Sequence, residues 1–120
     1  MRFPTKYVPD SWRFVKLVTP EGETVIKVLA GWFGSGLTKG GSFKLSSECV
    51  SFEWDKENKE YICDQYSGNV YHLKEENEHT STLMANAFVN VKEKFVNSGA
   101  RSFDWIELDE VKRYFTEKNK

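Results

Sequence analysis

Residues 11–33 read SWRFVKLVTPEGETVIKVLAGWF, and this stretch decides the fold because it holds two strand-like runs around one turn. β-Branched and aromatic residues, which favour strands, dominate both 11–19 and 24–33. Between them, Pro20 presets φ and Gly22 can adopt the left-handed conformation of a hairpin turn. We therefore predict an antiparallel hairpin whose second strand carries alternate residues, from Ile26 to Trp32, on one apolar face.

Further strand-like runs follow the hairpin and are separated by polar turn residues. Residues 49–74 predict a three-stranded meander, because turn signals lie at 55–58 and at Tyr66-Ser67-Gly68-Asn69. If Ser67-Gly68 forms a two-residue turn, Cys63 lies opposite His72 with both side chains on one face. The predicted strands after the hairpin cover residues 42–45, 49–54, 59–65 and 70–74.

A helix is predicted next, because apolar residues recur at helical spacing from Met84 to Phe95. Thr80 or Ser81 can cap its start, and Gly99 suits the left-handed position just after its end. The apolar stripe of this helix is expected to pack on a sheet surface that includes Ile26, Val28, Phe52 and Trp54.

The order of these elements predicts an α+β fold in a single domain over residues 1–120. The expected architecture is a curved antiparallel sheet of five to six strands packed against one amphipathic helix. The remaining segments are an irregular lead-in over 1–9, a last strand over 102–108, a short C-terminal helix over 109–115 and a frayed tail over 116–120.

The net charge of −1 is unevenly distributed. Residues 1–48 carry +3, residues 49–80 carry −5 and residues 81–120 carry +1. The absence of a concentrated basic face argues against nucleic-acid binding. The acidic segment reads either as a solvated sheet face or as a surface for a basic partner. Without a signal peptide or an apolar span the chain is expected in the cytoplasm, with no membrane contact and with Cys49 and Cys63 reduced.

The glycine-rich segment 31–43 is the main candidate binding site, because it holds five of the eight glycines among large aromatic residues. It matches neither a P-loop nor a dinucleotide motif. It can be a plain connection, a partner-binding loop, or an anion site at Lys39 with Trp32 or Phe33 as a stacking platform. The candidate binding residues are Trp32, Phe33, Gly34, Gly36, Lys39, Gly40 and Gly41, joined by Tyr66 and Tyr71, which are predicted on the sheet face of Asp64.

Catalytic signals are weak in this sequence. A Cys63–His72 pair could activate a thiolate, although no orienting group or oxyanion donor can be named. Metal-binding spacings of cysteine and histidine are absent, and no cofactor motif occurs. We therefore name no catalytic residue, metal or cofactor.

Three segments carry a resemblance to a family. Residues 12–17 (WRFVKL), 28–34 (VLAGWFG) and 43–47 (FKLSS) resemble small uncharacterised proteins of bacterial and phage genomes. Residues 66–71 show a weaker similarity to the same proteins. In that family the loop tends to run Gly-Asp-Ser-Trp-Lys-Leu-Ser-Ser, where this chain has Gly40-Gly41-Ser42-Phe43. The resemblance covers about the first 50 residues and brings no activity with it; it implies an accessory protein of a mobile element.

Together these observations predict a non-enzymatic binding protein that engages a protein partner, such as a phage or prophage accessory factor. Two alternatives stay open at this point. One is a small-molecule, nucleotide or anion binder that uses residues 31–42. The other is an enzyme that uses Cys63 and His72.

Overall fold

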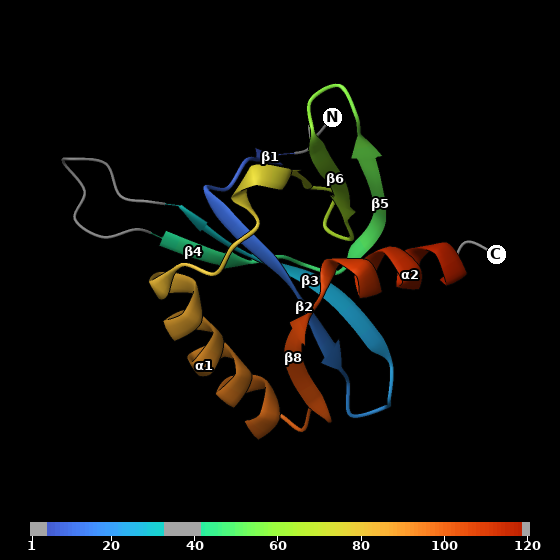
Figure 1. The fold of residues 1–120 in the computed structure, drawn as a ribbon. Helices are drawn as coiled ribbons and strands as arrows, with labels where there is room; N and C mark the ends of the chain where they lie inside the picture. Colours follow the sequence, from blue (N-terminus) through green and yellow to red (C-terminus); the bar gives the residue numbers. More distant parts are fainter. Residues whose placement is uncertain (1–4, 33–41, 119–120) are drawn as a thin grey trace.

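The computed structural model describes residues 5–32 and 42–118, and Figure 1 shows their arrangement. The predicted hairpin is present, and its strands pair antiparallel from Ser11 opposite Gly31 to Val18 opposite Thr24. The turn is closed by Gly22 at φ 90°. In chain order the elements are β1 (Lys6–Tyr7), β2 (Ser11–Val18), β3 (Thr24–Trp32), β4 (Ser42–Leu45), β5 (Cys49–Asp55), β6 (Glu60–Gln65), β7 (Val70–Lys74), the 3-10 turn η1 (Glu75–Asn77), α1 (Thr82–Asn97), β8 (Ser102–Ile106) and α2 (Leu108–Lys118).

The strands of the described residues form two four-stranded sheets. Sheet I has the order β4-β3-β2-β8 and sheet II the order β1-β7-β6-β5, with β1 parallel to β7 and the other neighbours antiparallel. The prediction of an α+β domain is therefore confirmed, whereas the single curved sheet of five to six strands is wrong.

The chain changes sheets at Ser46, next to the end of β4. The backbone N–H of Ser46 donates to the carbonyl of Val28 at 2.8 Å, and the Ser46 hydroxyl accepts from the N–H of Val28 at 2.8 Å. Three residues later β5 begins and pairs with β6 instead. Strand alternation in a sequence reports which face is buried, but it does not report which sheet a strand joins.

Sheet I is covered on both faces. One face of β2 and β3 packs against sheet II, and its buried side chains include Trp12, Phe14 and Val28. The other face packs against α1 and includes Val15 and Leu29. Because both faces are apolar, these central strands read as almost continuous hydrophobic runs.

Helix α1 has the predicted apolar stripe but covers the other face of the hairpin. Met84 is fully buried, Phe88 stacks on Trp105 at 4.3 Å and Phe95 stacks on Phe103 at 5.2 Å between ring centroids. The predicted surface was wrong, because its residues face the space between the sheets or, like Trp54, remain 42% exposed. The N-terminal cap is Ser81, whose hydroxyl accepts from the N–H of Met84 at 3.2 Å, and Gly99 at φ 99° follows the helix as predicted.

Helix α2 closes one end of the space between the two sheets. Val111 and Phe115 are buried there, and the Phe115 ring lies 5.8 Å from the ring of Phe52. The sequence placed a frayed tail from residue 116 onward, but α2 continues through Lys118. Within residues 5–32 and 42–118, neither helix has the length and apolarity needed to cross a bilayer.

Candidate functional site

A groove lies where β1, β3 and β4 meet at one edge of the molecule. It encloses about 380 Å³, and we call it the edge groove. Two of its lining residues, Trp32 and Ser42, belong to the glycine-rich segment 31–43 and lie on either side of residues 33–41, which are outside the described part of the chain. The edge groove is lined by Lys6, Tyr7, Val8, Trp32, Ser42, Phe43 and Lys44.

The ring of Tyr7 organises the edge groove. Strand β1 places Tyr7 opposite Tyr71 of β7, and the two rings stack at 4.9 Å. The Trp32 ring lies 6.0 Å from the Tyr7 ring at a tilt of 59°, and the Lys44 ammonium lies 5.4 Å from its centroid. This spacing allows a cation–π attraction, which holds a positive charge over an aromatic wall.

The electrostatics of the edge groove are one-sided. Among the described residues two lysines, Lys6 and Lys44, line it, and no carboxylate does. Val8 and Phe43 remain 38% and 46% exposed beside them. Strand β4 is the last strand of sheet I, so its outer backbone groups face no further strand in the described residues. The groove therefore offers apolar contact, positive charge and a strand edge together.

The structure separates the two tyrosines that the sequence placed together. Tyr66 is 79% exposed near the tip of the β6–β7 hairpin, whereas Tyr71 is 1% exposed and points between the sheets. Asp64, by contrast, is exposed on the outer face of sheet II. Burial is the main cause that raises the pKa of the Tyr71 phenol, and the neighbouring Tyr7 and Cys49 raise it further. The Tyr71 hydroxyl has no hydrogen-bond partner among the described residues. The prediction that both tyrosines lie on the sheet face of Asp64 is therefore wrong.

Most of the predicted glycine-segment site lies outside the described residues. Of its candidate residues the structure describes Trp32, which lines the edge groove. Phe33, Gly34, Gly36, Lys39, Gly40 and Gly41 lie outside the described residues. Sequence reasoning missed Lys6, Tyr7 and Lys44; only the position of Lys44 directly after the glycine segment could have indicated one of them.

The Cys63–His72 pair does not form, because the β6–β7 turn has three residues instead of two. The N–H of Gln65 donates to the carbonyl of Asn69, and Gly68 takes φ 93°. Cys63 then lies opposite Tyr71, and His72 lies opposite Ile62. A one-residue shift of register moves a side chain to the other face of the sheet. Cys63 therefore points into the core and His72 points outward.

The two cysteines are a buried thiol pair. Both are free, and Cys49 and Cys63 are 1% and 0% exposed. The side chain of Gln65 donates to the Cys49 sulfur at 3.2 Å. Burial, reinforced by the contact with Cys49, raises the pKa of the Cys63 thiol well above its usual value. Cys63 is therefore a poor nucleophile, because the thiolate is the reactive form.

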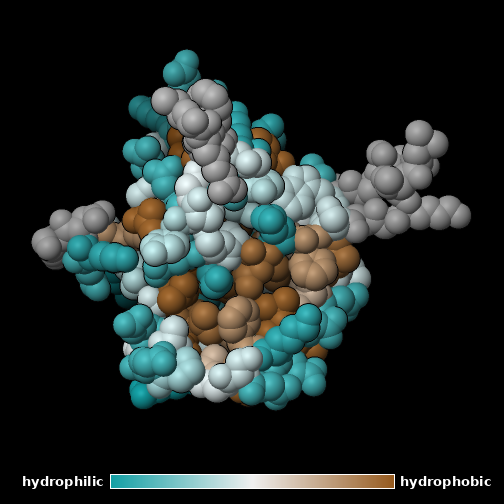
Figure 2. Space-filling model, turned by 180° about the vertical axis from the view of Figure 1, so that it is seen from behind, coloured by the Kyte–Doolittle hydropathy of each residue, from teal (hydrophilic) through white to brown (hydrophobic). Residues whose placement is uncertain are grey.

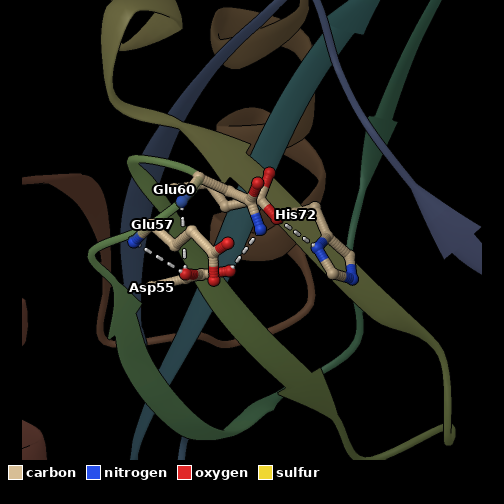
Figure 3. A network of polar contacts seen from close by, with 5 residues as sticks. Asp55, Glu57, Glu60 and His72 are labelled. Atoms are coloured by element: carbon tan, nitrogen blue, oxygen red, sulfur yellow. Dashed lines mark hydrogen bonds and ion pairs between the residues drawn. The ribbon is translucent and has the colours of Figure 1, made fainter.

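The outer face of sheet II carries a polar network (Figure 3). His72 Nδ1 lies 2.8 Å from a carboxylate oxygen of Glu60. The Asp55 carboxylate accepts hydrogen bonds from the backbone N–H groups of Glu57 and Asn58 and from the side-chain amide of Asn58. These bonds lower the pKa of the Asp55 carboxyl group, and those from Asn58 have the largest effect. No group of three potential metal ligands occurs in residues 5–32 and 42–118. The Asp55 carboxylate thus serves the turn between β5 and β6.

Hydrophobic residues also gather on the face seen from behind (Figure 2). Hydrophobicity alone does not select an occupant for such an area. We therefore place the candidate site at the edge groove, where aromatic rings and charge of one sign converge.

No family model, curated protein or solved structure matches this chain. Its function is consequently inferred from the chemistry of the site.

Proposed function

We propose that the chain is a non-enzymatic binding protein that holds an acidic, extended segment of a protein partner in the edge groove. The observation that carries this proposal is the composition of the groove: in the part of the chain that the structure describes, two lysines and three aromatic rings line it, and no carboxylate does. Aromatic anchors surrounded by charge of one sign are typical of interface hot spots.

The edge groove offers three kinds of contact to such a segment. Carboxylates of the partner would lie near Lys6 and Lys44, and its apolar side chains would pack on Trp32 and Phe43. Its backbone could extend sheet I at β4, the edge strand. Strand addition supplies affinity through the backbone, and the side chains supply specificity.

Binding is favoured over catalysis for a specific reason. The enzyme alternative depends on Cys63 and His72, whose side chains lie on opposite faces of sheet II. The nucleotide or anion alternative relies on Lys39, with Trp32 or Phe33 as a stacking platform, and of these three the described residues include Trp32 alone. The resemblance to small phage and bacterial proteins leads us to propose a bacterial or phage protein as the partner.

Site-specific photo-crosslinking tests the proposal. A p-benzoylphenylalanine at position 43, on the edge strand β4, is expected to trap a discrete partner in a bacterial lysate. The same group at position 89 on α1, where Val89 is 63% exposed, provides the control. We expect Lys6→Glu with Lys44→Glu to abolish the adduct, whereas Lys94→Glu on α1 preserves it.

Peptide display then defines the chemistry of the segment. Selection on the wild-type chain is expected to enrich sequences that combine carboxylates with aromatic or aliphatic residues. Enrichment of basic sequences, or an adduct of equal yield from position 89, would refute the proposal. Stabilisation by a nucleotide in a thermal-shift panel, lost in Trp32→Ala, would favour the alternative function.

A further inference from the structure

Strand β5 forms the other edge of sheet II, opposite β1. Two large apolar side chains on it are exposed, Val50 at 44% and Trp54 at 42%. A cleft of about 320 Å³ lies between β5 and α2, and we call it the seam cleft. An edge strand with exposed apolar residues is a template for pairing with another chain.

Aromatic rings form the floor of the seam cleft. The rings of Trp54 and Tyr61 lie 4.7 Å apart, and those of Phe52 and Tyr61 stack at 5.0 Å. From α2, Phe115 packs on Phe52, and the Lys112 ammonium lies 5.3 Å from the Tyr61 ring. Side chains that enter the cleft from a neighbouring strand would therefore meet aromatic rings, with Glu53, Lys112 and Thr116 completing the lining.

The other face of β5 is acidic. Pairing with β6 places Glu53 opposite Ile62 and Asp55 opposite Glu60, so both carboxylates project from the outer face of sheet II. On the same face the Ser51 hydroxyl donates to Asp64 at 2.7 Å. A strand added beside β5 would therefore find carboxylates on one face and aromatic rings on the other.

We propose that β5 accepts an extended segment of a partner protein in which basic and apolar residues alternate. Side chains of a strand point alternately to its two faces, so such a segment would place lysine or arginine beside Glu53 and Asp55 and apolar residues in the seam cleft. A second copy of this chain is the poorer occupant, because it would bring its own Glu53 and Asp55 onto the same acidic face.

This surface is independent of the edge groove. The edge groove includes β1, and the second surface is formed by β5, which is the opposite edge of sheet II. The edge groove is proposed to bind an acidic segment, and β5 a basic one. Loss of binding at one surface therefore leaves the proposal for the other intact.

Fluorescence anisotropy with labelled synthetic peptides tests the inference on the full chain. The probe is an eight-residue peptide in which lysine and valine alternate, and the control has the same composition as a block of lysines followed by a block of valines. We expect the alternating peptide to bind at least tenfold more tightly. Backbone N-methylation of all valines blocks one edge of the peptide, and N-methylation of all lysines blocks the other. Strand addition predicts that one of these two peptides loses at least tenfold in affinity while the other binds like the parent.

Charge and cleft variants locate the binding. Glu53→Lys and Trp54→Ala are each expected to weaken binding at least tenfold. Glu93→Lys, at an exposed position on α1, should change binding less than twofold. Asp55 is left intact because it holds the adjacent turn. Equal binding of the alternating and block peptides, equal effects at Glu53 and Glu93, or a dimer in sedimentation that Glu53→Lys strengthens would overturn the inference.

Discussion

Replacing Phe88 by alanine measures how strongly α1 is held on sheet I. The Phe88 ring stacks on Trp105 at 4.3 Å and lies 5.4 Å from the ring of Phe103. The side chain is mostly buried, so most of the roughly 1.5–3 kcal/mol for burying a phenylalanine is lost. Each of the two aromatic pairs adds about 0.5–1.5 kcal/mol. We therefore expect the free energy of unfolding to fall by about 2–5 kcal/mol.

Asn90→Ala is the matched control, because Asn90 lies on the exposed side of the same helix. It should change the free energy of unfolding by less than about 0.5 kcal/mol. Urea denaturation followed by tryptophan fluorescence gives both values, with equal m values expected for the three proteins. Trp105 is a direct reporter, since removal of Phe88 exposes the indole that it covers.

A double-mutant cycle with Trp105→Ala separates the ring contact from general destabilisation. We expect a coupling energy of about 0.5–1.5 kcal/mol between Phe88 and Trp105. Equal destabilisation by Phe88→Ala and Asn90→Ala would show that α1 is rotated relative to sheet I. A coupling energy near zero would show that the two rings do not stack.

Two further predictions concern the crossing between the sheets and the β5–β6 turn. Ser46→Ala should lower the free energy of unfolding by about 1–3 kcal/mol, because it leaves the buried N–H of Val28 without its acceptor. In the same urea assay Ser67→Ala, at an exposed position, should change the free energy of unfolding little. In an NMR titration the pKa of Asp55 should lie below that of an ordinary aspartate, and Asn58→Ala should raise it. Because the pKa of this carboxyl group is lower in the folded than in the unfolded state, the carboxylate stabilises the fold above its unfolded pKa. This stabilisation is lost as the pH falls through the folded pKa. An unchanged Asp55 pKa in Asn58→Ala would contradict the assigned hydrogen bonds.

The sequence was sufficient for elements whose signals are local. Pro20 and Gly22 mark the β2–β3 turn, and the spacing from Met84 to Phe95 marks α1 and its buried side. The cap at Ser81 likewise depends on a residue within three positions of its partner, Met84.

Features that depend on distant residues were not predictable in this way. Ser46 carries no sequence signal for leaving sheet I, because its partner Val28 lies 18 positions away. Gly68 suits both a two-residue and a three-residue turn, and that single difference moved His72 away from Cys63. The edge groove joins Tyr7 to Lys44 across unrelated segments, so only Trp32 of its described residues was named from the sequence.

The burial of β3 on both faces leaves its alignment open to error during folding. Val28 faces one hydrophobic layer and Leu29 the other, so a slip by one position would still give each layer an aliphatic side chain. Something other than hydrophobicity must forbid the slip. Gly31 can do this, because a Cβ at its place would lie 2.9 Å from the Ser11 hydroxyl oxygen and 3.2 Å from a carbon of Met84. In a slipped strand Ala30 or Trp32 would occupy that position, and its side chain would clash with these atoms. The first glycine of the glycine-rich segment therefore fixes the register of the hairpin by excluding the slipped pairing.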